Sequence, residues 1–227
     1  APLRNDGQGA ILRADGTVRP SSNRGTGIAL TGSAKGAFAW ELGWTTSDNE
    51  SASTPGRPSA LHIDSTGTVA VGMARGAHYF SANDVSMERS FAGDEAGFSL
   101  ASGDVNQDGT SDWLIGAPGS NLVIALDSTT LEQIGSWSGA GRFGHAIAVC
   151  PDKNDQPQLL IGAPLEKSTG SVRIFPAFSA APTAVLEGTA SGSELGTSIG
   201  CIPDGFTAGA PGLTGSPAMV LWSRFGP

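Results

Sequence analysis

Basic residues are scarce in this chain of 227 residues, which has 13 Lys and Arg against 21 Asp and Glu and a formal net charge of −8. Nucleic-acid binding needs a basic surface, and anionic membranes attract clustered Lys and Arg, so the composition argues against both partners. Long apolar runs are also missing, since no stretch approaches the roughly eighteen apolar residues of a membrane-spanning helix. We expect no nucleic-acid partner and no membrane insertion.

Histidine is rare as well, and the signals for catalysis are weak. His62, His78 and His145 lie far apart without the close pairing that zinc sites use. Segment 196–200 matches the G-x-S-x-G pattern and segment 135–139 (Gly-Ser-Trp-Ser-Gly) is similar to it, but neither precedes the helix that a nucleophile elbow requires. No pair of carboxylates stands out for glycoside chemistry. We therefore expect a protein that is not an enzyme and has no catalytic residues.

Glycine and proline are abundant, at 33 and 14 residues, and short apolar runs alternate with Ser, Thr, Asn and Asp. This pattern is typical of many strands joined by tight turns. The tripeptide Gly-Ala-Pro begins at Gly116, Gly162 and Gly209, and eroded forms occupy the same place at Gly32 and Gly72. The spacings of 40, 44, 46 and 47 residues indicate a propeller or solenoid array. We predict an all-β protein with repeats at about 9–50, 57–90, 96–138, 143–188 and 195–227.

An acidic loop distinguishes the third repeat, with oxygen-bearing side chains at alternate positions from residue 104 to residue 108 and a further carboxylate at residue 112. Calcium takes six to eight oxygen ligands from carboxylates, amides and backbone carbonyls. We predict one calcium ion bound by Asp104, Asn106, Asp108, Asp112 and the carbonyl of Thr110.

This loop has two other interpretations. An EF-hand would have Glu at position twelve and helices on both sides, but that position is Ile115 and the flanking residues are strand-like. A turn rich in Asn, Asp and Gly that binds no metal is the remaining alternative. The equivalent loops of the other repeats lack the alternating carboxylates, so we expect a single site.

The run from Gly97 through the acidic loop to Gly116-Ala117-Pro118 resembles the FG-GAP repeat of integrin α-subunit-like β-propellers. The resemblance implies four-stranded blades, some with calcium in the hairpin between the first two strands, and partner binding on the opposite face. Because five repeats fill the chain, we predict a single β-propeller domain over residues 1–227 with five blades. A fragment of a larger ring is the alternative, because the family more often has seven blades.

The predicted function is that of a non-catalytic, calcium-binding adhesion or recognition module that is secreted, periplasmic or on the cell surface. Its ligand would be a protein or a glycan. A carbohydrate-binding lectin, or a hydrolase or lyase on a propeller scaffold, are the alternatives. The binding face that the resemblance implies would include the connections near Glu166, Lys167, Trp137 and Arg142. The ligand-binding candidates are Trp44 and Trp137, as exposed aromatic platforms, and Arg142.

The two cysteines, Cys150 and Cys201, each follow an apolar segment in neighbouring repeats. In a propeller these positions would be adjacent near the axis, so a disulfide between two blades, formed in an oxidising compartment, is one interpretation. Two small buried thiols are the other.

Overall fold

A computed structural model describes the chain continuously over residues 94–177, 179–203 and 205–212. Outside these ranges it describes the strands and a few adjoining residues, namely 8–12, 18–24, 30–31, 37–40, 43–46, 51–53, 58–64, 68–73, 76–81, 84–90 and 219–224. Over these residues the protein is all-β, as predicted, with 21 strands and one short 3-10 helix. No helix in the described residues is long and apolar enough to cross a membrane.

The first strands form two sheets. A hairpin of two strands, β1 (Gln8–Leu12) and β2 (Val18–Arg24), is a sheet by itself. The next sheet has the four strands β3 (Leu30–Thr31), β4 (Ala37–Trp40), β5 (Gly43–Thr46) and β6 (Ser51–Ser53).

Three further sheets of four strands and one of three follow along the chain. The first two are made of β7 (Pro58–Ile63), β8 (Val69–Met73), β9 (Gly76–Ser81) and β10 (Asp84–Ser90), then β11 (Ser99–Gly103), β12 (Asp112–Ala117), β13 (Leu122–Leu126) and β14 (Gln133–Ser138). The other two are made of β15 (Ala146–Pro151), β16 (Pro157–Ala163), β17 (Ser171–Pro176) and β18 (Ala184–Glu187), then β19 (Ser198–Ile202), β20 (Gly205–Ala210) and β21 (Met219–Arg224). The 3-10 helix η1 (Glu166–Ser168) lies between β16 and β17.

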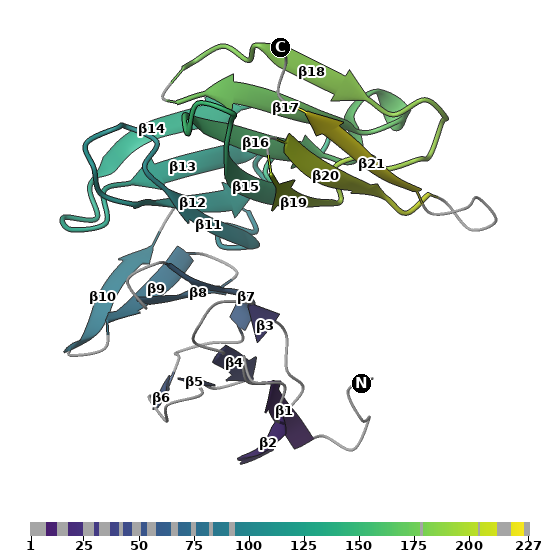
Figure 1. Cartoon of the computed structure of the whole chain (residues 1–227). Helices are drawn as coiled ribbons and strands as arrows, with labels where there is room; N and C mark the ends of the chain where they lie inside the picture. Colours follow the sequence, from purple (N-terminus) through teal and green to yellow (C-terminus); the bar gives the residue numbers. More distant parts are fainter. Residues whose placement is uncertain are drawn as a thin grey trace.

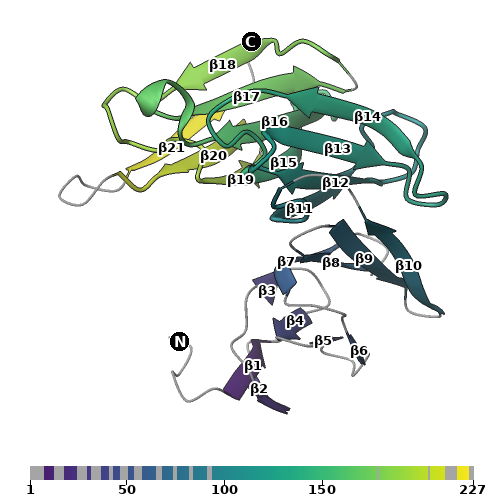
Figure 2. The same ribbon diagram turned by 180° about the vertical axis from the view of Figure 1, so that it is seen from behind.

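Every sheet is an antiparallel meander, because each strand pairs with the strand that follows it in the chain. The first strands of successive sheets lie side by side: β11 contacts β7 and β15, and β15 contacts β19. Figures 1 and 2 show the sheets of β11–β14, β15–β18 and β19–β21 packed against one another. Tight turns favour this order, since short connections can join only neighbouring antiparallel strands.

Hydrophobic layers fill the space between neighbouring sheets. In β12 all six residues are buried, with Leu114 in one layer and Trp113 and Ile115 in another. Alternate residues of a strand point to opposite faces, so a central strand that packs on both sides is apolar throughout. Trp113 lies in the layer that reaches Ala70 of β8, so this tryptophan packs between two repeats.

At Gly72, Gly116 and Gly162, the repeated glycine lies against the backbone of the next sheet. A Cβ atom would lie 2.1 Å from the Gly97 carbonyl oxygen at Gly72, 2.2 Å from the Gly144 oxygen at Gly116, and 2.1 Å from the Gly196 oxygen at Gly162. Real Cβ atoms do not approach oxygen so closely, so these positions require glycine for the sheets to approach each other. The repeated motif is therefore a contact between sheets.

The same turn precedes the first strand of three sheets. Gly97, Gly144 and Gly196 have φ angles of 88, 91 and 93°, a conformation that favours glycine. The amide of each donates a hydrogen bond to the carbonyl of the tripeptide glycine in its own sheet, at 2.9, 3.1 and 3.0 Å respectively. The two glycine motifs of a repeat are thus joined within the sheet, and in the third and fourth repeats each also contacts a neighbouring sheet.

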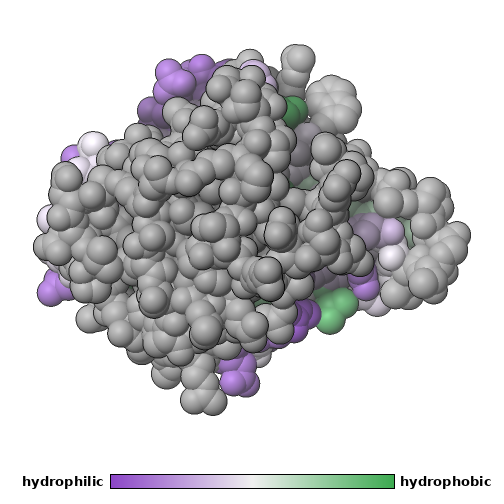
Figure 3. Space-filling view, turned by 90° about the horizontal axis from the view of Figure 1, so that it is seen from below, coloured by the Kyte–Doolittle hydropathy of each residue, from purple (hydrophilic) through white to green (hydrophobic). Residues whose placement is uncertain are grey.

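The surface of the described residues is mainly polar, in keeping with the acidic composition. In Figure 3, hydrophilic residues predominate among those coloured at the rim, with a few apolar ones between them. Among the described side chains, the exposed large hydrophobic residues are Leu165, 53% exposed, and Val185, 44% exposed.

Candidate functional site

The acidic loop connects β11 and β12 and is organised by its own side chains. The carboxylate of Asp104 accepts hydrogen bonds from the amides of Asp108 (3.0 Å) and Gly109 (2.9 Å). The amide of Asp108 also donates to the side-chain oxygen of Asn106 at 2.9 Å. Gly109, at φ 90°, lets the chain turn back toward β12. The loop therefore folds around its oxygen atoms, as the sequence pattern suggested.

Asp108 lies at the exposed side of this loop. Its Oδ1 accepts hydrogen bonds from the Thr110 hydroxyl (2.5 Å) and the Thr110 amide (2.8 Å). The Asn106 side-chain amide donates to its Oδ2 at 2.8 Å. These bonds stabilise the charged form and lower the pKa of the Asp108 carboxyl. Asp108 is therefore an exposed, charged carboxylate that is available to a cation.

Asp112 is the buried end of the loop. It is fully buried, and its Oδ2 accepts hydrogen bonds from the amides of Val105 (3.0 Å) and Asn106 (3.3 Å). Its Oδ1 has no hydrogen-bond partner among the residues that the structure describes. Burial raises the pKa of Asp112 to about 6, and the nearby charges of Asp108 and Asp104 act in the same direction. A buried carboxylate oxygen without a partner is costly, and a bound cation would satisfy it.

A third carboxylate comes from a part of the sequence that motif reasoning missed. Oxygen atoms of Asp108, Asp112 and Asp127 all lie within 4.8 Å of one another. Asp127 follows β13, in the turn that leads to β14. The signal that could have found it is strand register, because Trp113 pairs with Leu126 and the residues next to them are Asp112 and Asp127.

The residues present fit a hard cation such as calcium. The predicted donors Asp108 and Asp112 are brought together with Asp127, while Asp104 and Asn106 lie in the same loop and hold its backbone. Carboxylate oxygens are the preferred ligands of calcium, and none of these groups is a soft donor. The Asp108, Asp112 and Asp127 cluster can therefore bind a metal such as calcium.

The prediction of Trp137 as an exposed platform is wrong. Trp137 is only 5% exposed, and its indole N–H donates to the Ser179 carbonyl at 2.7 Å. Its ring lies 6.3 Å from that of Phe175, so it belongs to the layer between two sheets. The residue falls on a strand face that turns inward, which sequence position alone did not reveal. The side chain of Trp44 lies outside the described residues.

Arg142 lies on the turn before β15 and contacts the preceding sheet. Its guanidinium pairs with Glu95 at 2.7 Å and lies 5.5 Å from the centre of the Phe98 ring. Both charged side chains are part-exposed, at 32% and 41%. The contact joins equivalent turns of two neighbouring repeats at the end of the sheets opposite the acidic loop.

The structure describes the side chains of His145 and His62, which bond to a backbone carbonyl and to a serine hydroxyl, whereas the side chain of His78 lies outside the described residues. His145 Nδ1 lies 3.2 Å from the Thr197 carbonyl oxygen, which accepts its hydrogen bond, so the partner is backbone and not a carboxylate. Burial lowers the pKa of His145. His62 Nε2 lies 2.8 Å from Ser102 Oγ, and this hydrogen bond joins β7 to β11. A second bond between these two sheets runs from Ser59 Oγ to the carbonyl of Gly97, which precedes β11.

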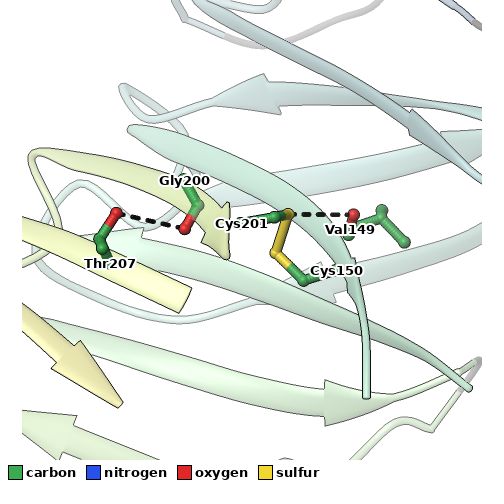
Figure 4. Close-up of a disulfide and its surroundings, with 5 residues drawn as sticks. All are labelled: Val149, Cys150, Gly200, Cys201 and Thr207. Carbon is green, nitrogen blue, oxygen red and sulfur yellow. Dashed lines mark hydrogen bonds between the residues drawn. A yellow bond between two sulfur atoms is a disulfide. The ribbon is translucent and has the colours of Figure 1, made fainter. Parts of the chain in front are cut away.

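The cysteines form a disulfide between sheets. Cys150 at the end of β15 is bonded to Cys201 near the end of β19, with Cα atoms 5.4 Å apart (Figure 4). Cys150 is fully buried, and the Cys201 sulfur lies 3.4 Å from the Val149 carbonyl oxygen. Of the two interpretations left open by the sequence, the structure has the bridge.

Repeated antiparallel sheets, glycine contacts between them and an acidic loop in the first hairpin of one sheet define a repeat-built all-β protein. Residues 96–131 match the FG-GAP repeat family, which confirms the resemblance seen in the motifs. Over 128 residues, 48% of this chain, the sequence is 28% identical to integrin alpha-5 of Xenopus laevis, a distant similarity. The chain covers 12% of the length of that relative.

Proposed function

We propose that the repeats form the blades of a five-bladed β-propeller. Two observations support this: β7, β11, β15 and β19 follow one another side by side, and the same glycine contact recurs between successive sheets. A closed ring also removes exposed sheet edges. Small-angle X-ray scattering tests the shape, because a compact chain of this length has a radius of gyration of about 17 Å. A clearly larger value for the monomer would indicate an open arc of a larger ring.

The calcium ion in this proposal is structural and orders the hairpin of the third repeat. The observation that carries it is the buried Oδ1 of Asp112, which lacks a partner among the described residues and lies within 4.8 Å of carboxylate oxygens of Asp108 and Asp127. Metal that binds only the folded state raises its stability by mass action. The melting temperature of the wild type should therefore be higher in millimolar calcium than in EDTA.

The variant Asp108→Ala tests this assignment. It should lower the melting temperature in calcium but not in EDTA, because the lost group acts through the metal. Glu132→Ala is the matched control, since it removes an exposed carboxylate outside the loop. Equal melting of the wild type in both buffers would contradict calcium binding.

The biological role in this proposal is non-catalytic adhesion or recognition outside the cell. The disulfide and the distant similarity to an integrin support an extracellular location. The contact surface would be the end of the sheets that carries Arg142 and the loop after β16. There the exposed Leu165 lies beside Lys167, whose Nζ pairs with Glu187 at 2.5 Å. An exposed apolar side chain close in sequence to an exposed charge pair is suited to a protein partner.

The choice between a protein and a glycan ligand can be tested directly. A glycan array, run in calcium and in EDTA, should show no binding, because the described side chains include no exposed aromatic ring for a sugar to stack on. A protein partner captured by the wild type should be lost with Leu165→Asp and kept with Val185→Asp, the matched exposed position on β18. Binding confined to one sugar family would favour the lectin alternative.

A further inference from the structure

The strand register places two carboxylates opposite each other at the end of the third repeat. The last registered pair of β12 and β13 is Trp113 with Leu126, and one step further the same register places Asp112 opposite Asp127. Like charges directly opposite on neighbouring strands repel each other, and this repulsion is stronger when one of them is buried, as Asp112 is. The pair therefore needs positive charge between its members.

The corresponding positions of the fourth and fifth repeats, which the structure describes, hold no such pair. In the fourth repeat they are Gln158 and Pro176, and in the fifth they are Gly205 and Arg224. In the repeats where the structure describes this pair, the acidic loop and the opposed carboxylates occur together in the third alone. If Asp127 served only the turn after the third strand of its sheet, it would have no reason to occur in the same repeat as the acidic loop.

The turn at Asp127 leaves part of its carboxylate available. Its Oδ1 accepts hydrogen bonds from the amides of Thr129 (2.9 Å) and Thr130 (2.7 Å) and from the Thr130 hydroxyl (3.0 Å). All hydrogen bonds that the structure records for this side chain fall on Oδ1. The group is thus held in place by one oxygen, within 4.8 Å of the partnerless, fully buried Asp112 and of Asp108.

We propose that Asp127 is a further ligand of the calcium ion, so that the metal joins the β11–β12 loop to the turn between β13 and β14. This inference rests on the proposed calcium site and adds to it a donor outside the loop motif. The metal then ties three of the four strands of this sheet together at one end.

The test is isothermal titration of the full chain with calcium, after EDTA treatment, for the wild type and Asp127→Asn. The asparagine keeps an oxygen acceptor for the turn and loses the charge, so calcium affinity should fall by about 10- to 100-fold, because affinity follows the number of charged ligands. The matched control is Asp152→Asn. Asp152 Oδ1 likewise accepts amides of its own turn, from Asn154 and Gln156, at 2.8 and 2.9 Å, but belongs to no acidic cluster in the described residues.

Thermal melting in EDTA separates a ligand from a turn residue. With the repulsion removed, metal-free Asp127→Asn should melt at the same temperature as the wild type or higher. Unchanged calcium affinity in this variant would overturn the role of Asp127 while leaving the calcium site standing. A lower melting temperature in EDTA, with the same loss in the control, would also overturn it. No heat of binding with the wild type would overturn the calcium site itself.

Discussion

The tripeptide glycines offer a stringent test of how the sheets are held together. In Gly162→Ala the new Cβ would lie 2.1 Å from the Gly196 carbonyl oxygen, 2.9 Å from its carbonyl carbon and 3.1 Å from its Cα atom. All three are backbone atoms at the start of the next sheet, in a turn whose φ of 93° leaves little freedom to adjust. The two sheets must separate by roughly 1 Å to relieve the contact, which disturbs the apolar layer between them.

Gly209→Ala is the matched comparison, because it changes the same residue of the same motif. Its Cβ would meet the Ser198 hydroxyl at 2.3 Å, and the next atom lies at 3.6 Å, so rotation of one side chain relieves the contact. Overpacking a core costs about 1–3 kcal/mol. We expect about 3 kcal/mol for Gly162→Ala, at the upper end because backbone must move, and less than about 1 kcal/mol for Gly209→Ala.

Thermal and urea unfolding measure this difference. For a chain of this size, about 3 kcal/mol lowers the melting temperature by roughly 6–12 °C. The intrinsic effect of replacing glycine by alanine in a strand is the same in both variants, so it cancels in the comparison. Equal destabilisation by the two substitutions would refute the argument that the motif acts as a contact between sheets.

Three further outcomes can be measured. In EDTA the free energy of unfolding should fall as pH rises from about 4 to about 6, because Asp112 has a folded-state pKa raised from 3.8 to about 6 and the folded protein holds its proton longer. The full shift of the Asp112 pKa corresponds to about 3 kcal/mol of unfolding free energy, which solvent screening at the loop reduces to about 1–2 kcal/mol. Bound calcium, or the substitution Asp112→Asn, should remove this dependence of stability on pH. Replacing both Cys150 and Cys201 by serine should lower the free energy of unfolding by about 4 kcal/mol, the value that the chain-entropy model gives for a sequence separation of 51. Calcium affinity should stay unchanged. An unaltered melting temperature would contradict this role of the disulfide. A fluorophosphonate probe should not label Ser102, because its bond to His62 lies between two packed sheets, and labelling would revive a hydrolase.

Much of the architecture was accessible from the sequence because it depends on local rules. The period of the Gly-Ala-Pro motif indicated the repeats, and short apolar runs between turn residues indicated strands. The oxygen-bearing side chains that recur between Asp104 and Asp112 marked the acidic loop. All five predicted metal ligands lie in this one short segment of the sequence. Each of these features is contained in a stretch that is short enough to be recognised without a partner strand.

The tertiary structure decided what depends on register and on neighbouring sheets. Asp127 joins Asp112 only because β12 and β13 pair in one register, and a shift of one residue would move it to the other face. Trp137 is buried because the next sheet covers the face of β14 on which it lies. Cys150 and Cys201 come within bonding distance because β15 and β19 are neighbours, although 51 residues separate them. Sequence patterns record which residues a strand contains, whereas packing between strands decides which of them meet.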